Sequence, residues 1–140
     1  MEGKSYRVIK GRGVFPGIVE AEALVTTESI SLLGGVNQET SEVIELNHPL
    51  RGEHISGKVL MVYSGRGSVG STSTLYYLKK IGKNPAALVM VIPDPPVVFG
   101  AILTEIPTIV DVSVDDLKTI KNHSRVKING ETGEIFVYDV

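Results

Sequence analysis

The sequence predicts an α/β domain that is rich in β structure, with a partly parallel central sheet and two to three helices. Residues 59–112 alternate between apolar runs and amphipathic segments in the order strand, helix, strand, helix, strand. This order implies parallel strands joined by right-handed crossovers. The segments on either side instead show the alternating polarity and turn residues of antiparallel hairpins.

Length and composition agree with one globular domain over residues 1–140. Of the 140 residues, 42% are apolar and 21% are charged. A chain of this length and apolar content can bury a hydrophobic core. The 14 basic and 16 acidic residues are well mixed and leave a net charge of −2. Binding of nucleic acid or of a membrane surface by bulk charge is therefore not expected.

Cysteine is absent from the sequence. This absence excludes a disulfide framework, a thiolate nucleophile and cysteine-held metal or iron–sulfur ligands within this chain. The N-terminus lacks an apolar signal core, and no apolar run approaches membrane-spanning length. A cytoplasmic location is the default expectation.

The first part of the chain is predicted to contain mainly strands and turns. Residues 6–9 form a strand, and residues 11–13 form a turn after it. Residues 17–27 have loosely alternating apolar positions, which favours a half-buried strand. Residues 28–35 contain a short helical turn ended by paired glycines, and residues 36–57 form an irregular loop with room for one short strand.

A turn rich in Gly and Ser at residues 64–71 organises the rest of the chain. The apolar run 59–63 leads into it, and a helical pattern begins near Ser71. A strand that feeds such a turn and then a helix is a typical way to hold an anion, because glycines allow close approach and free N–H groups point at the bound group. Arg66 adds a planar cation suited to a carboxylate or phosphate.

Beyond the central helix, the pattern alternates between helices and buried strands. The elements expected there, in chain order, are a helix stop at 82–85, a strand buried on both faces at 86–92, a short helix at 97–103, a buried strand at 109–112, a helix capped by Ser113 that runs through Leu117 and Ile120, and a hairpin at 126–138.

The central turn also fits patterns of nucleotide binding. Residues Gly65 to Gly70 match G-x-G-x-x-G, and Asp94 follows at about the interval of a ribose-binding acid. A dinucleotide fold needs several successive βαβ units, for which the chain is too short and too rich in β structure. A phosphate-binding loop would need lysine where Ser71 stands. The turn could also be only a tight connection between strand and helix.

The turn resembles the signature of the small subunit of the aconitase X family. The specific part is Gly65-Arg66-Gly67-Ser68, followed by a helix start rich in Ser and Thr. Supporting likenesses are spread over most of the chain, at 11–25, 49–52, 56–60, 84–87 and 106–107.

This resemblance implies a swivelling β/β/α domain, the counterpart of the mobile domain of aconitases. The domain would dock as a heterodimer on a large subunit that holds an iron–sulfur cluster. In the archaeal form of the family, the implied hydro-lyase reaction converts (R)-5-phosphomevalonate into trans-anhydromevalonate 5-phosphate in a modified mevalonate pathway to isoprenoids. No metal is expected on this chain.

The resemblance places the proton acceptor on Ser68. Because a serine hydroxyl is a weak base, it must act as an alkoxide in a positive field. The extra negative charge on the substrate also needs fixed donors. We expect substrate binding by the residues around the serine: Gly65, Arg66, Gly67, Gly70 and Ser71.

Three alternatives stay open at this point. The chain could serve a dehydratase for another hydroxy acid, such as a hydroxyproline. It could be a swivel-type phosphocarrier or binding module, although the central turn lacks the histidine that would carry a phosphoryl group. It could also be a stand-alone interaction domain.

Other polar residues are weaker candidates for a site. His48, His54 and His123 are expected in loops or at the surface, Arg51 in a surface ion pair and Asp94 in turn formation. The apolar segment 97–103 is either a face for a partner or an ordinary buried helix.

Overall fold

The computed structural model describes residues 5–66 and 68–139. The elements, in chain order, are β1 (Ser5–Lys10), β2 (Arg12–Phe15), β3 (Ile18–Val25), α1 (Leu32–Gly35), β4 (Val59–Val62), α2 (Gly70–Lys80), β5 (Ala87–Met90), α3 (Pro95–Thr104), β6 (Thr108–Val110), α4 (Val114–Lys118), β7 (Arg125–Asn129) and β8 (Glu134–Asp139).

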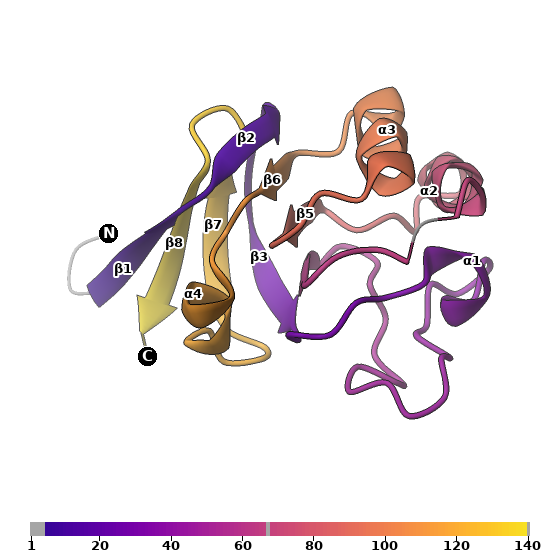
Figure 1. Cartoon of the computed structure of the whole chain (residues 1–140), viewed down its shortest axis with the longest axis horizontal. Coiled ribbons are helices and arrows are strands. Elements are labelled where there is room, and N and C mark those ends of the chain that lie inside the picture. Colours follow the sequence, from indigo (N-terminus) through magenta and orange to yellow (C-terminus); the bar gives the residue numbers. More distant parts are fainter. Residues whose placement is uncertain (1–4, 67, 140) are drawn as a thin grey trace.

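The strands form one eight-stranded sheet in the order β1-β8-β7-β3-β4-β5-β6-β2 (Figure 1). The four neighbours β3, β4, β5 and β6 are parallel, whereas the remaining pairs are antiparallel. The predicted α/β class with a partly parallel sheet is therefore confirmed. The expected helices are present, and so is the short helical turn predicted within residues 28–35, which is α1.

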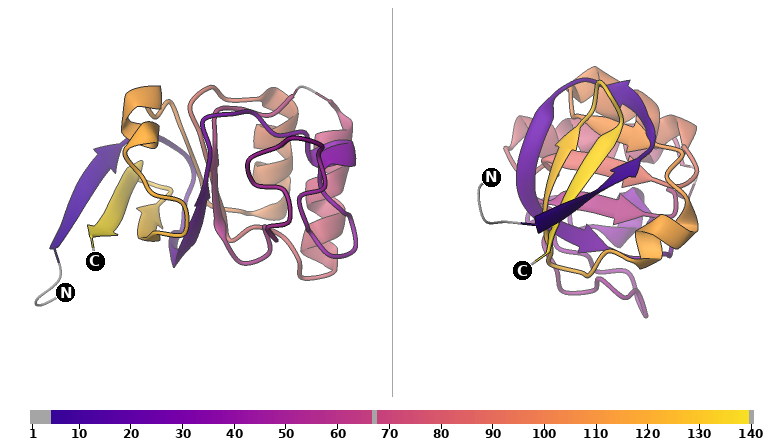
Figure 2. Two further views of the ribbon diagram at one scale, coloured as in Figure 1. Left: turned by 90° about the horizontal axis from the view of Figure 1, so that it is seen from below. Right: turned by 90° about the vertical axis from the view of Figure 1, so that its left-hand side faces the viewer.

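The first two strands bring opposite ends of the sheet together. Only Gly11 separates β1 from β2, yet β1 pairs with β8 and β2 pairs with β6. The sheet consequently curls round on itself, as the right-hand view of Figure 2 shows. The predicted turn at residues 11–13 is wrong, because from Arg12 the chain continues as a strand whose partner is almost a hundred residues away in sequence.

The parallel strands are covered on both faces, and their side chains divide between two cores. One core fills the curled sheet, and the other lies between the parallel strands and the helices α2 and α3 (Figure 2). In β4, Val59 and Met61 point into the first core, and Leu60 and Val62 into the second. This alternation follows from the two-residue period of a strand.

The helices begin and end largely as the sequence predicts. Ser113 caps α4, since its Oγ accepts a hydrogen bond of 3.0 Å from the Asp116 amide. Helix α3 begins earlier than predicted, with two prolines in its first turn, a position that proline tolerates. Its side chains divide between a buried face and an exposed face, which includes Phe99 and Leu103. No helix among the described residues is long and apolar enough to cross a membrane.

The tip of the β7–β8 hairpin passes very close to β2. A Cβ atom on Gly130 would lie 2.0 Å from the Phe15 carbonyl oxygen, and one on Gly13 would lie 2.2 Å from the Gly130 carbonyl oxygen. Nearby, the Gly11 amide donates a 2.8 Å hydrogen bond to the Gly133 carbonyl. Only glycine allows two backbones to approach so closely.

We expect Gly130→Ala to destabilise the fold strongly. The new methyl group meets backbone that cannot move aside, so the loss in free energy of unfolding should be about 3 kcal/mol and the melting temperature should fall by roughly 10 °C. Gly82→Ala is the control, because a Cβ atom there meets open space and only the positive φ of 74° is unfavourable, at about 1 kcal/mol. Equal melting temperatures for the two variants would contradict the proposed close packing.

His123 joins two distant segments by ionic contacts. Its Nδ1 is hydrogen-bonded to Glu22 of β3, and its Nε2 lies 2.8 Å from Glu53 in the long loop before β4. The hydrogen bond to Glu22 raises the pKa of His123 above its ordinary value, and the charge of Glu53 acts in the same direction. The ring is about half exposed, so solvent screens these interactions.

The raised pKa predicts a pH-dependent contribution of His123 to stability. It should be fully present below the unfolded-state pKa of about 6.5 and should be lost as pH rises through the higher folded-state pKa. In urea unfolding, His123→Gln should therefore lower stability more at pH 5.5 than at pH 8.5, by less than about 1 kcal/mol. An equal loss in free energy of unfolding at both pH values would show that the ion pairs of His123 contribute nothing to stability.

Candidate active site

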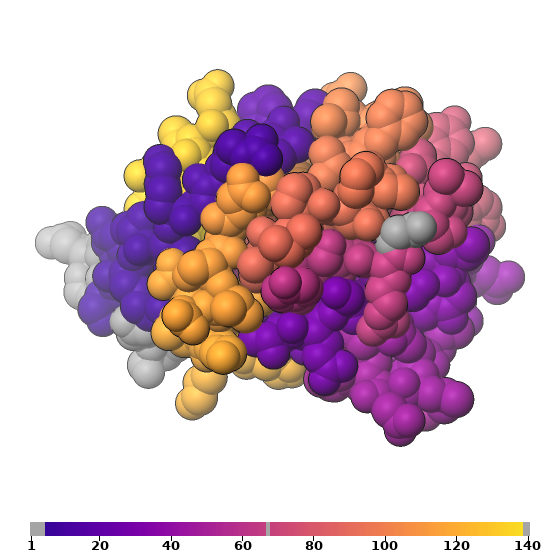
Figure 3. All heavy atoms as spheres, viewed as in Figure 1, coloured from indigo at the N-terminus to yellow at the C-terminus, as the bar shows by residue number. Residues whose placement is uncertain are grey.

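The central turn emerges at the carboxyl edge of the parallel strands. It leaves the end of β4 and leads directly into α2. Figure 3 shows its residues, in pink, at the surface beneath the orange residues of α3 and beside the purple residues of the segment before β4. Ligands of open α/β sheets commonly bind at this edge, where the strands end and the connections to the helices begin.

Ser68 lies two residues before the first residue of α2, and its two oxygen atoms accept hydrogen bonds from the start of that helix. The Gly70 amide donates to Ser68 Oγ at 3.1 Å, and the Ser71 amide donates to the Ser68 carbonyl at 2.9 Å. The serine is only partly exposed. Its hydroxyl oxygen is therefore fixed at the positive end of an 11-residue helix, where negative charge is favoured.

Two glycines of the turn lie in close contact with neighbouring side chains. A Cβ atom on Gly70 would lie 2.2 Å from the Leu33 side chain. A Cβ atom on Gly65 would lie 2.7 Å from Asp94 Oδ2 and 2.8 Å from the Val97 side chain. Gly67 lies outside the described residues. The glycines at 65 and 70 thus let α1 and the start of α3 approach the serine turn from two sides.

Backbone hydrogen bonds attach the segment before α1 to the turn. The Tyr63 amide donates to the Glu28 carbonyl at 3.1 Å, and the Ile30 amide donates to the Ser64 carbonyl at 3.0 Å. This pairing extends the parallel contact of β3 and β4 beyond the ends of both strands. Residues 28–30 consequently form one wall beside the turn.

Side-chain hydroxyls attach the turn to the loop after β5 and the start of α2 to the start of α3. Ser64 Oγ donates to the Ile92 carbonyl at 2.7 Å, and Thr72 Oγ1 donates to the Pro96 carbonyl at 2.6 Å. These hydrogen bonds explain part of the run of hydroxyl residues in this stretch. Ser71 and Thr74 are buried and face the core.

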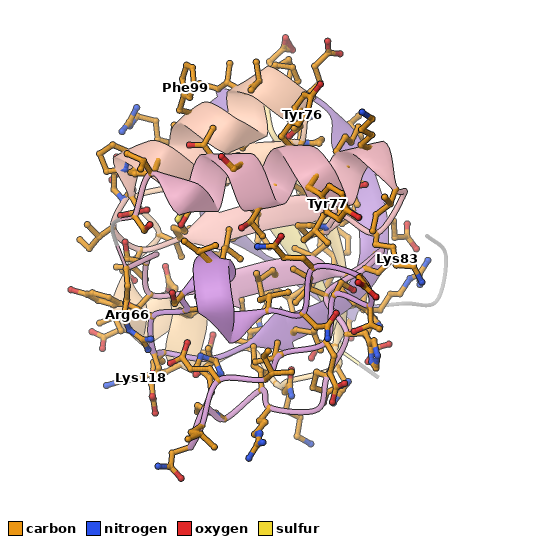
Figure 4. All side chains as sticks on the ribbon, turned by 90° about the vertical axis from the view of Figure 1, so that its right-hand side faces the viewer. Arg66, Tyr76, Tyr77, Lys83, Phe99 and Lys118 are labelled. Atoms are coloured by element: carbon orange, nitrogen blue, oxygen red, sulfur yellow. The ribbon has the colours of Figure 1, made fainter. Side chains whose placement is uncertain are left out.

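The guanidinium of Arg66 is anchored across the turn. Its Nη1 lies 2.5 Å from Glu45 Oε2, and its Nη2 donates to the Ser29 carbonyl at 2.8 Å. Burial acts to raise the pKa of Glu45, but hydrogen bonds from Arg66 and from the Ser31 amide outweigh it and hold that pKa below its usual value. In Figure 4, Arg66 lies beside the start of α2, at the edge of the molecule.

Asp94 is buried directly behind the turn. It occupies the cap position of α3, yet its side chain does not cap that helix, whose first two residues are prolines without amide hydrogens. Its Oδ2 instead packs against Gly65. The sequence suggested turn formation for this aspartate, and the structure adds that its carboxylate faces the segment that carries Ser68.

The structure gathers the described members of the predicted site into one place. Gly65, Arg66, Ser68, Gly70 and Ser71 all lie in the turn or at the start of α2. The amides of Gly70 and Ser71 are engaged inside the turn, and the Ser71 side chain is buried. Substrate binding by these two residues remains a prediction, and it would require their present hydrogen bonds to be exchanged.

The histidines lie outside this site. His48, expected in a loop or at the surface, is in a loop but buried: its Nδ1 accepts a 3.0 Å hydrogen bond from the Leu50 amide. Its Nε2 lies 3.1 Å from the Ser29 carbonyl, the same oxygen that Arg66 contacts. His48 therefore helps to fix the segment that anchors Arg66.

Sequence reasoning missed Glu45. It lies 21 positions before Arg66 in an irregular polar stretch, and no local pattern links the two residues. Only the fold of residues 36–57 brings its carboxylate to the turn.

Residues 5–66 and 68–139 offer no set of side chains that would hold a metal ion or an iron–sulfur cluster. The sequence contains no cysteine, and the described part of the chain holds no group of three or more His, Asp or Glu side chains arranged to bind a metal. A cluster held by thiolates requires another chain.

Comparisons with known proteins agree on one family. The family model of the aconitase X swivel domain matches residues 8–137. The phosphomevalonate dehydratase small subunit of Pyrococcus abyssi is 39% identical over 127 residues, which cover 91% of this chain and 95% of that protein. The small subunit of the same name from Methanosarcina acetivorans is 37% identical, covering 91% and 88%.

The structural comparison leads to the same family. The crystal structure of Thermococcus kodakaraensis aconitase X in its holo-form matches with a TM-score of 0.89 and 32% identity, covering 95% of this chain and 99% of that one. The resemblance predicted from the Gly65–Ser68 motif is confirmed, and so is the swivel-type fold. The chain belongs to the aconitase X swivel-domain family.

Proposed function

We propose that this chain is the small subunit of a two-subunit hydro-lyase that dehydrates (R)-5-phosphomevalonate to trans-anhydromevalonate 5-phosphate. The observation that carries the proposal is the position of Ser68, whose Oγ accepts the Gly70 amide hydrogen at the start of α2. The names of the relatives supply the substrate. The chain would act as one swivelling domain over residues 1–140, and a cytoplasmic location stays a prediction.

In this proposal Ser68 removes the proton next to the substrate carboxylate. A donor at Oγ and the positive end of α2 both favour the deprotonated serine, because each stabilises negative charge on that oxygen. The C–H bonding electrons first move into the carboxylate and then form the carbon–carbon double bond, while the C–O bond to the neighbouring hydroxyl breaks. The proton on Ser68 and the departing hydroxyl together account for the water that is lost.

The large subunit supplies what this chain lacks. An iron–sulfur cluster on that subunit would take the leaving hydroxyl as a Lewis acid. This chain contributes the serine, the fixed backbone of the turn and the charge of Arg66.

Arg66 is proposed to bind the substrate carboxylate while it stays anchored. A guanidinium has five N–H groups, of which the contacts with Glu45 and Ser29 use two. The remaining N–H groups can reach a carboxylate, since the side chain is 44% exposed. The anchoring means that little side-chain entropy is lost on binding.

A dehydratase for another hydroxy acid is the second candidate, because nothing in the turn itself selects a phosphorylated substrate. Purification of the chain from native extract with its partner, followed by assays with 5-phosphomevalonate and with hydroxyproline, distinguishes the two. An iron-containing larger chain and loss of water from 5-phosphomevalonate are expected. A chain that stays alone and inert would contradict the proposal and favour an interaction domain.

Ser68→Ala should abolish turnover in the assembled enzyme. Loss of a general base lowers kcat by about 10²–10⁴-fold, and the small change in a partly exposed side chain should leave folding and assembly intact. The matched control is Ser73→Ala, at an exposed position on α2, which should retain full activity. Full activity of the Ser68 variant in the complex would rule out Ser68 as the base.

Glu45→Gln should impair substrate binding more than it impairs chemistry. The substitution removes the ion pair that holds Arg66, so we expect KM to rise by about fivefold to tenfold with a smaller effect on kcat. Glu39→Gln, at an exposed position of the same loop, is the control. An unchanged KM for the Glu45 variant would show that the anchoring of Arg66 does not matter to the substrate.

A further inference from the structure

One end of the curled sheet opens into a pocket of about 510 Å³. Strand β1 contributes Arg7 to its wall, β8 contributes Val137 and Tyr138, and the rest comes from the segment 119–124 between α4 and β7. The right-hand view of Figure 2 faces the end of the sheet where β8 finishes. The mouth of a curled sheet is a common place for a small ligand, and none of these residues belongs to the serine turn.

Arg7 lies on the inner face of the curled sheet. It is opposite Val137 in the pairing of β1 with β8, and Val137 points into the core of that sheet. Ile9, two residues further along β1, points into the same core. Because side chains alternate between the two faces of a strand, Arg7 continues this inward row at the point where the sheet opens. A charge on such a face is unfavourable unless polar groups meet it.

Hydrogen bonds fix the Arg7 guanidinium in the wall of the pocket. Its Nη1 donates to Thr119 Oγ1 at 2.7 Å, and its Nη2 donates to the Thr119 carbonyl at 2.6 Å. The Thr119 hydroxyl in turn donates to the Asp116 carbonyl at 2.7 Å. Both oxygen atoms of Thr119 are neutral, so these hydrogen bonds orient the guanidinium and do not cancel its charge.

The wall formed by residues 121–124 is held by hydrogen bonds of its own. Ser124 Oγ donates to the Lys121 carbonyl at 2.6 Å and closes the turn. The Val25 amide donates to Asn122 Oδ1 at 2.8 Å, which attaches the turn to the end of β3. Asn122 Nδ2 carries two hydrogen atoms, and no acceptor within residues 5–66 and 68–139 takes them. The pocket is therefore formed without a ligand and offers a donor to one.

The positive charge of the pocket comes from Arg7 and Lys121. Lys121 is exposed, and no carboxylate of the described residues forms an ion pair with it. His123 adds no net positive charge, because Glu22 and Glu53 both contact its ring. None of the described residues that line the pocket is acidic. In a chain whose net charge is −2, such a pocket favours an anion.

We propose that this pocket binds a phosphate dianion, free or carried by a small molecule, between Arg7 and Lys121. A guanidinium presents parallel N–H groups to phosphate oxygens, and an ammonium adds a second positive charge. Asn122 Nδ2 adds a neutral donor. A volume of about 510 Å³ exceeds that of phosphate alone, so an organic group has room beside Val137 and Tyr138. This site is separate from the serine turn and does not depend on the proposed function.

An NMR titration of the isotope-labelled full chain tests this inference. The probes are inorganic phosphate and glycerol phosphate at low ionic strength. For at least one probe we expect saturable shifts of the Asn122 and Ser124 amides with a Kd of about 1 mM, and weaker binding in salt because the site is open to solvent. Glycerol phosphate that binds at least about threefold more tightly would identify a carried phosphate, whereas equal or reversed affinities would identify free phosphate.

Two charge-removing variants and one control locate the site. Lys121→Gln should raise the Kd at least about fivefold, since it removes one of the two cations, and Arg7→Gln should raise it further. Lys118→Gln removes the same charge from an exposed position on α4 outside the pocket, and it should change the Kd by less than about twofold.

Thermal melting checks the fold of each variant. Because the Arg7 side chain also contacts Thr119, the Lys121 variant decides the matter if Arg7→Gln does not fold. Three results would overturn the inference: no saturable shifts with either probe, shifts spread evenly over the basic residues of the surface, or a Kd that Lys121→Gln leaves unchanged.

Discussion

Strand β4 is buried along its whole length, and the arrangement of the site depends on this burial. Its four residues lie between β3 and β5 and point alternately into the two cores. Polar chemistry therefore has no place along the strand and can begin only where the chain leaves the sheet. The turn that follows carries Ser68 to the edge of the sheet, next to the start of α2.

The turn is held from two sides by segments of different origin. On one side, residues 28–30 and Glu45 belong to the long excursion between β3 and β4. On the other side, Ile92 and Asp94 belong to the crossover between β5 and α3. A serine that acts as a base, as proposed for Ser68, would gain from such support, because its oxygen is fixed relative to the donors before substrate arrives.

The proposed division of work between two subunits accounts for several features at once. The chain has no thiolates, a serine at a helix start and an arginine anchored close to that serine in the same turn. Each feature alone has an ordinary explanation. Together they agree with the proposal that this chain supplies one part of an active site and that a partner supplies the rest.

The sequence by itself determined the elements whose signals are local. The period-two pattern of the buried strands, the Ser113 cap, the hairpin turn at its glycines and the Gly65–Ser68 motif depend on neighbouring residues only, and each was predicted from them. The family, and with it the candidate base, followed from the same motif.

Only the tertiary structure decided features that join distant segments. The sequence predicted a turn at residues 11–13, where the chain in fact passes from β1 into β2. Arg12 is part of a strand only because it pairs with β6, and that pairing leaves no signal in the local sequence. The Glu45–Arg66 ion pair likewise arises where two separate loops meet. Local propensity carries no information about contacts between distant residues, because these contacts are set by the closure of the sheet and by the packing of the loops on its edge.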